Sequence, residues 1–110
     1  MIDENTFRQE SDKALESIKQ ALFRAEEKGG FETDEKSGVL NVLFEDGARF
    51  VFTPNTPVRQ IWISALSTSY KLEWNPAAHA FTLPKTGEDL HRLTQRLLRE
   101  QLQDPDLTLN

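Results

Sequence analysis

Carboxylates crowd one short stretch of the 110-residue chain, and they are the side chains best suited to chemistry. The stretch spans residues 26–35 and contains Glu26, Glu27, Glu32, Asp34 and Glu35. Carboxylate oxygens bind hard cations, and without His or Cys beside them such a site is shallow, exposed and poorly selective. The same residues also fit a solvated helix end followed by a charged edge strand, which discourages edge-to-edge aggregation. Composition alone leaves both interpretations open.

The net charge of −5 is confined to the first third of the sequence. Residues 1–35 hold ten acids and five bases, which gives −5, whereas residues 36–110 hold eight of each. Such an asymmetry favours a cationic partner or a hard metal ion. A sequence pI near 5.0 argues against a nucleic-acid partner, since phosphate contacts need a basic stripe.

The segment TPVRQIWISA, residues 56–65, alternates like a β-strand but places its largest hydrophobe on the polar side. In a strand, Trp62 shares a face with Gln60, while Ile61 and Ile63 point the other way. An exposed aromatic side chain is typical of a contact site. A shifted register or a β-bulge would instead turn it into the core.

No catalytic constellation is present in the sequence. It lacks a Gly-x-Ser-x-Gly elbow, a phosphate-binding glycine loop, a His-Glu-x-x-His motif and a dinucleotide fingerprint. His79 lies in a polar turn and His91 near a helix start, so we expect both to be solvated side chains rather than ligands. Zero cysteines exclude disulfides, thiolate metal sites and a cysteine nucleophile. We therefore expect a protein that is not an enzyme.

Length and hydropathy predict one soluble globular domain. A chain of 110 residues is long enough for one core and too short for two. Its apolar runs are only a few residues long, so no membrane span is expected. The N-terminal MIDENTF lacks a basic segment followed by an apolar one, so no secretory signal is expected either.

Two helices are predicted, one toward each end of the chain. An apolar stripe at spacings of three and four over residues 7–25 predicts the first, which Gly29-Gly30 ends. The candidates for its N-cap are Thr6 in a Thr6-x-x-Gln9 capping box, Asp3 and Asn5. A leucine stripe over residues 90–102 predicts the second helix, with Thr86 as its N-cap.

Between the helices the hydrophobic period changes from 3.6 to 2, which predicts short strands. The predicted strands span residues 31–36, 39–44, 48–53, 58–65, 70–74 and 80–83. Asp46-Gly47 is a strong hairpin signal and the other connections are brief, so consecutive strands should form an antiparallel meander. The terminal helices cannot bury their stripes on each other and leave the inward β face bare. The predicted fold class is therefore α+β, a two-layer sandwich with both helices on one face of an antiparallel sheet of five or more strands.

The other face of the sheet is expected to stay uncovered. Its predicted members are Asn41, Leu43, Arg49, Val51, Gln60, Trp62, Ser64, Lys71 and Glu73. A polar, solvated face is normal for an antiparallel sheet, but Trp62 flanked by Leu43 and Val51 is not. We expect these three side chains to form a partner-binding cluster, together with Gln60 and Asn41.

The strand segments also carry a resemblance to a known family. The residues concerned are Gly38-Val39-Leu40, Phe44-Glu45-Asp46-Gly47, Thr56-Pro57 and Gln60-Ile61-Trp62-Ile63-Ser64. On these residues the chain resembles a bacterial-type frataxin over residues 6–102, in the order helix, acidic edge strand, meander, helix. Residues 1–102 would then form a single frataxin-like domain, and residues 103–110 a C-terminal tail in which Leu107 and Leu109 can dock.

The resemblance implies a small, monomeric, iron-binding protein of iron–sulfur cluster assembly in the bacterial cytoplasm. It implies contact with the cysteine desulfurase and the iron–sulfur scaffold protein, through Trp62 and Gln60 on the sheet face. It also implies a weak, exposed site for iron along the first helix and first strand. The residues of this acidic ridge would be Glu26, Glu27, Glu32, Asp34 and Glu35, with Asp12 and Glu16 as additions.

The sequence departs from the family where family members often place acids in the second half of the first helix. This chain has Lys19, Gln20 and Arg24 there, so the ridge is thinner. Two rival functions remain open. One is a small protein-interaction module, an adaptor or chaperone anchored by Trp62 with no physiological metal. The other is an iron-oxidising or iron-storing activity, for which the sequence lacks a centre of His and inward carboxylates.

Overall fold

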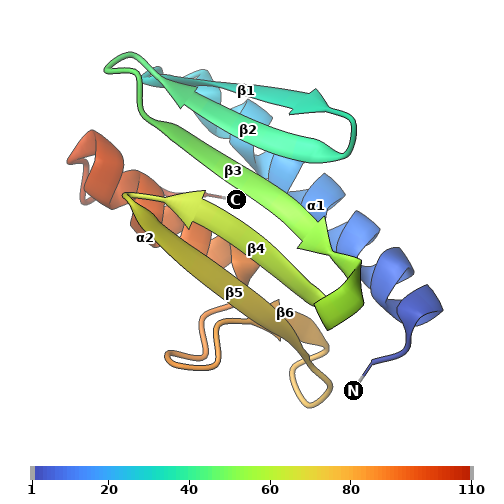
Figure 1. The fold of residues 1–110 in the computed structure, drawn as a ribbon. Helices are drawn as coiled ribbons and strands as arrows, with labels where there is room; N and C mark the ends of the chain where they lie inside the picture. The colour runs from blue at the N-terminus through green and yellow to red at the C-terminus, as the bar shows by residue number, and fades with distance from the viewer. Residues whose placement is uncertain (1, 110) are drawn as a thin grey trace.

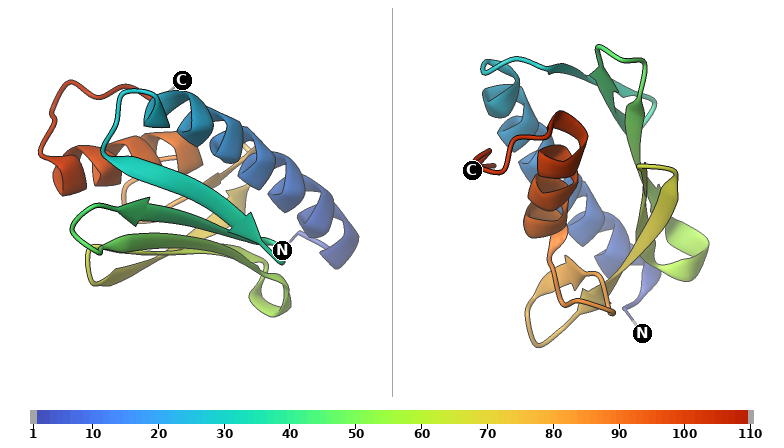
Figure 2. Two further views of the ribbon diagram at one scale, coloured as in Figure 1. Left: turned by 90° about the horizontal axis from the view of Figure 1, so that it is seen from above. Right: turned by 90° about the vertical axis from the view of Figure 1, so that its left-hand side faces the viewer.

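Residues 2–109 of the computed structural model form two helices, six strands and one 3₁₀ turn (Figure 1). The elements are α1 Glu4–Glu26, β1 Phe31–Lys36, β2 Val39–Phe44, β3 Arg49–Asn55, η1 Thr56–Val58, β4 Gln60–Ala65, β5 Thr68–Asn75, β6 Ala80–Thr82 and α2 Leu90–Leu102. The strands lie in the sheet in chain order, and every neighbouring pair is antiparallel. Both helices lie on one face of the sheet, and Figure 2 shows its other face free of them. The predicted two-layer α+β sandwich is confirmed.

The core lies between the sheet and the helix layer. Phe50 and Phe52 of β3, like Ile61 and Ile63 of β4, are at most 1% exposed, and they alternate with residues that face away from the helices. The α1 stripe closes over them, with Phe7 fully buried at its start. Burying side chains of this size stabilises the fold by roughly 1.5–3 kcal/mol each relative to exposure. The period-2 pattern therefore decided both the strands and the face on which the helices pack.

An aspartate caps the N-terminus of each helix. The backbone N–H of Thr6 donates to Asp3 Oδ1 at 2.8 Å, so Asp3 caps α1 and the capping box at Thr6 is wrong. At α2 the cap is Asp89, whose Oδ1 accepts from the N–H of Arg92 at 2.8 Å. Thr86 lies in the turn before it, so the predicted Thr86 cap is wrong as well. Asp89 is fixed there because it also forms a β-bridge with Thr82 at the end of β6.

The strand predicted over residues 58–65 begins two residues later. Residues 56–58 form η1, since Pro57 favours the first turn of a helix, and Arg59 then takes a left-handed φ of 56° that redirects the chain into β4. Val58 is consequently 45% exposed in the turn and does not share the strand face of Trp62. β3 in turn extends through Pro54, which pairs with Ile61 of β4 beyond the last β2 pairing at Phe52. A proline is tolerated there because β2 no longer needs its missing N–H.

The C-terminal tail folds back along α2. Leu109 is only 7% exposed, and its backbone N–H donates to Gln95 Oε1 at 2.9 Å. Arg99 Nε donates to the carbonyl of Leu107 at 2.7 Å. These contacts add the tail to the layer that covers the sheet.

A bidentate ion pair fastens the turn before α2 to the helix itself. Arg96 Nε and Nη2 donate to the two carboxylate oxygens of Glu88 at 2.8 and 2.9 Å. These bonds lower the pKa of the Glu88 carboxyl below its ordinary value of 4.5 and raise the pKa of Arg96.

Replacing Glu88 by Gln should lower the free energy of unfolding at pH 7 by about 1 kcal/mol. A carboxyl with a lowered pKa in the folded state stabilises the fold above its ordinary pKa, and this contribution disappears as the pH falls through the lowered value. The difference between the two proteins should therefore shrink from pH 5 downward in urea-unfolding experiments. Glu100→Gln, whose carboxylate lies 3.7 Å from Arg96 and is half exposed, is the control with little effect. A difference that does not change with pH would contradict the assignment.

Candidate functional site

The register of the strands gathers two of the predicted acidic residues on the uncovered face of the sheet. Glu32 of β1 lies opposite Leu43 of β2, and Asp34 lies opposite Asn41. Residues directly opposite in an antiparallel pair point to the same face, so both carboxylates share the face that carries Trp62. Part of the acidic stretch therefore shares one surface with the aromatic residue, although the two are separate features in the sequence.

Trp62 lies near the middle of this surface in β4, and 37% of it is exposed. Its indole Nε1 donates to Gln60 Oε1 at 2.8 Å, and Gln60 Nε2 donates to Glu73 Oε2 at 3.0 Å. Lys71, directly opposite on β5, holds its ammonium 4.9 Å from the ring centroid, a cation–π geometry. The prediction that Trp62 lies on the uncovered face is confirmed, and its ring is held in a polar network on the surface.

The predicted cluster of Trp62 with Leu43 and Val51 is only partly assembled. Trp62 lies opposite Thr53 of β3, and Val51 is a diagonal neighbour two residues along the same strand. Leu43 pairs with Arg49, two strands from Trp62 and four residues along, which is roughly 16 Å by strand spacing. The expectation that Leu43 adjoins Trp62 is therefore wrong. Leu43 is 37% exposed near the acidic edge instead, and Asn41 and Val51 lie between the two.

Other acidic residues of the predicted ridge hold the helix to the edge strand. Glu26 Oε2 accepts the backbone N–H of Thr33 at 2.8 Å, so the end of α1 satisfies a donor on the free edge of β1. Lys19 Nζ lies 3.0 Å from Glu16 Oε1 and 3.2 Å from Glu35 Oε1, which joins the middle of α1 to β1. These carboxylates face the helix side of β1 and are already engaged.

The predicted ligands therefore do not converge on one point. Within residues 2–109, no group of three or more His, Cys, Asp or Glu side chains is placed to hold a metal ion. Asp12 of α1, Glu27 in the turn after it, and Glu32 and Asp34 of β1 are exposed and spread along the chain. This donor set is chemically suited to a hard cation, but it lacks the convergence that a chelating site needs.

Lys19 lies between two carboxylates of the acidic ridge and partly neutralises their charge. Hydrogen bonds from Gln20 and then Lys19 lower the pKa of the Glu16 carboxyl, and bonds to Glu16 and Glu35 raise the pKa of Lys19. In the sequence, Lys19 stands out only as a departure from the family pattern. Its pairing with Glu35 joins residues 16 positions apart, which no local pattern reveals.

Replacing Lys19 by Gln should raise the pKa of the Glu16 carboxyl part of the way toward its ordinary value. The shift is partial because the hydrogen bond from Gln20 is the larger cause and remains. An NMR titration of the side-chain carboxyl carbon measures this pKa directly. Lys13→Gln, which removes a cation next to Glu10 instead, is the control that should leave Glu16 unchanged. An unchanged Glu16 pKa in the Lys19 variant would show that Lys19 does not stabilise this carboxylate.

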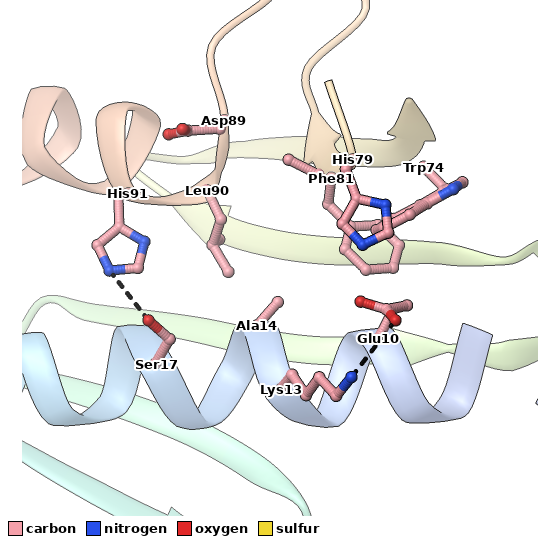
Figure 3. Close-up of a pocket in the computed structure, with 11 residues that line it drawn as sticks. Glu10, Lys13, Ala14, Ser17, Trp74, His79, Phe81, Asp89, Leu90 and His91 are labelled. Atoms are coloured by element: carbon pink, nitrogen blue, oxygen red, sulfur yellow. Dashed lines mark hydrogen bonds and ion pairs between the residues drawn. The ribbon is translucent and has the colours of Figure 1, made fainter. Parts of the chain in front are cut away.

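A hollow lies on the helix side of the molecule, between α1, β6 and the start of α2 (Figure 3). Trp74 is half-buried at the wall of this hollow, with the ring of His79 4.9 Å away by ring centroids. His91 lies across the hollow, with Nε2 3.4 Å from Ser17 Oγ. Neither histidine belongs to a metal-binding group within the described part of the chain. No local sequence pattern predicts this hollow, because its walls come from three separate segments.

No helix among residues 2–109 has the length and apolar character that crossing a membrane requires.

Comparisons with known proteins give a consistent result. A family model described as "Frataxin-like domain" matches residues 1–104. A protein named "Iron-sulfur cluster assembly protein CyaY" from Pseudomonas fluorescens (strain SBW25) is 30% identical over 88 residues, 78% of this chain and 80% of the relative. The protein of the same name from Pseudomonas fluorescens (strain Pf0-1) is 28% identical over 68 residues, so the match spans only 62% of that relative's length. The solved structure of a frataxin from Psychromonas ingrahamii superposes with a TM-score of 0.80 at 15% identity, covering 99% of this chain and 97% of the other. The last similarity concerns the fold alone.

Proposed function

The chain belongs to the frataxin-like family, and from that premise we propose that it acts in iron–sulfur cluster assembly as a non-enzymatic partner of the cysteine desulfurase and its scaffold protein. The related CyaY proteins carry the name "Iron-sulfur cluster assembly protein". In this proposal the protein works in the bacterial cytoplasm as a monomer and modulates sulfur transfer. It carries out no reaction of its own.

One observation carries the proposal: a single uncovered sheet face combines an exposed, hydrogen-bonded Trp62 with the carboxylates of Glu32 and Asp34 at its edge. Aromatic residues that are partly exposed and held in place are typical anchors of protein interfaces. Carboxylates at the periphery of such a surface speed encounter with a basic partner and orient it. The arrangement supports face-on docking, with Trp62 as anchor and Gln60, Asn41 and Val51 as neighbouring contacts.

Iron enters this proposal only as a weak association with exposed carboxylates. The oxygen donors of Glu27, Glu32 and Asp34 suit a hard cation, but the described side chains form no chelating group. Bound iron is therefore assigned no step in the proposed role. The chemistry that iron would supply at these carboxylates is charge neutralisation of the edge that faces the partner.

Trp62→Ala should weaken binding to a bacterial cysteine desulfurase and scaffold pair by about 30-fold, because it removes the anchor. Biolayer interferometry measures the dissociation constant and both rate constants. Reversing both charges in Glu32→Lys, Asp34→Lys should mainly slow association, by roughly tenfold at low salt and less at high salt. The double variant Glu100→Lys, Asp106→Lys, at exposed positions on α2 and on the tail that folds back along it, changes the net charge by the same amount and is the control.

The same measurements separate the proposal from its nearest rival. A small adaptor or chaperone anchored by Trp62 would lose binding to its own client in Trp62→Ala and be indifferent to charge reversal at Glu32 and Asp34. If the wild-type protein shows no binding to the desulfurase and scaffold at micromolar concentrations, the proposed function is wrong.

An anaerobic titration with ferrous iron tests the metal association separately. Paramagnetic broadening of NMR signals should appear first around Glu32 and Asp34, and only at millimolar iron, because the donors do not converge. In Lys19→Gln the broadening should extend to Glu16 and Glu35, whose carboxylates lose their internal cation. No localised effect in either protein would remove iron from the proposal and leave the partner contact standing.

A further inference from the structure

The hollow between α1, β6 and the start of α2 has the features of a binding site and plays no part in the proposed function. Its volume is about 240 Å³, and its lining includes Ala14, Leu90 and Phe81. Leu90 and Phe81 belong to the hydrophobic core, so this part of the lining is rigid and apolar. An engineered cavity of about 150 Å³ is enough to bind benzene, so the hollow has room for one small organic group.

Three aromatic rings form one wall of the hollow. Trp74 lies 4.9 Å from His79 and 5.2 Å from Phe81 by ring centroids, and both pairs are close to perpendicular. His79 has a left-handed φ of 51° in the turn between β5 and β6. A non-glycine residue adopts this conformation only at some cost in free energy, and here it accompanies the contact of its ring with Trp74. The electron-rich face of a tryptophan ring attracts organic cations, so Trp74 is the ring of this wall that favours one.

The carboxylate of Glu10 gives the hollow a negative charge. Figure 3 shows it rising from α1 toward the aromatic wall, and its side chain is only 18% exposed. Among the described residues that line the hollow, Lys13 is the only lysine or arginine, and its ammonium lies 3.6 Å from Glu10 on a side chain that is 75% exposed. Ion pairs this exposed are weak, so Lys13 is a poor counterion for Glu10. Asp89, the other acid of the lining, is engaged as the N-cap of α2.

We propose that this hollow binds an alkylammonium or alkylguanidinium group, with its stem on Ala14 and Leu90 and its charged head between Glu10 and the aromatic wall. Long cationic side chains and amines bury an apolar stem while keeping the charge at a polar edge. The carboxylate of Glu10 would repel an anion, and the described residues offer no group that could hold a metal there. The cation can be a free amine or guanidine, or an Arg or Lys side chain of a partner protein.

Four probes of similar size test the charge and shape of the site by NMR on the full chain: butylguanidinium, butylammonium, butyrate and 1-butanol. The two cations should cause saturable shifts at the Trp74 indole N–H and the Ala14 methyl, whereas butyrate and butanol should not. A blocked Ala-Arg-Ala peptide distinguishes the source. Tighter binding than butylguanidinium indicates a partner's side chain, and equal or weaker binding indicates a free cation.

Two substitutions on α1 should act in opposite directions. Glu10→Gln should weaken butylguanidinium binding about threefold or more, because it removes the charge that selects the cation. Lys13→Gln should strengthen binding, because it removes the competing ammonium. Glu16→Gln, another α1 carboxylate paired with a lysine but outside the hollow, should change nothing. Equal shifts with butyrate, or no saturable shift with either cation, would overturn the proposal, and so would unchanged binding in Glu10→Gln.

Discussion

Coverage of only one face of the sheet is the constraint on which the rest of the structure depends. The helix layer buries alternate residues of β2, β3 and β4, and the alternation of the backbone then obliges the intervening residues to face away from the helices. Trp62 occupies one of these positions between the buried Ile61 and Ile63, so it cannot enter the core without removing both. The hydrogen bond to Gln60 and the cation–π contact with Lys71 provide polar partners for a ring that has to remain exposed.

The same alternation divides the acidic stretch between two tasks. Glu32 and Asp34 point away from the helices, whereas Glu35 on the alternate side of β1 meets Lys19 of α1. Glu26 also turns inward to the strand edge. Some of the negative charge that looks continuous in the sequence therefore fastens α1 to β1, and the remainder is displayed. A charge distribution of this kind is better suited to steering a partner than to chelation.

Local sequence signals predicted most of the helices and strands, but few of the contacts between residues that are distant in the sequence. The bounds of β2 follow from the alternation of its residues and from the Asp46-Gly47 turn after it, both of which are readable within a few residues. The cap of α1 was ambiguous because Asp3 and Thr6 are both good caps, and the choice depends on where the first turn begins. The separation of Leu43 from Trp62 depends on the register accumulated across β2, β3 and β4, which no single strand encodes. The pairing of Lys19 with Glu35 and the walls of the helix-side hollow depend on how α1 lies over the sheet.

At each of the two outer edges of the sheet, an acidic residue interacts with the backbone of the edge strand. Glu26 occupies the N–H of Thr33 at the β1 edge, and Asp89 bridges to Thr82 at the β6 edge. Backbone pairing with a foreign strand is therefore hindered at either end, and recognition is left to side chains on the exposed face. Specificity held in side chains can change by single substitutions without disturbing the framework beneath. The protein can therefore evolve a preference for a different partner while its core residues stay the same.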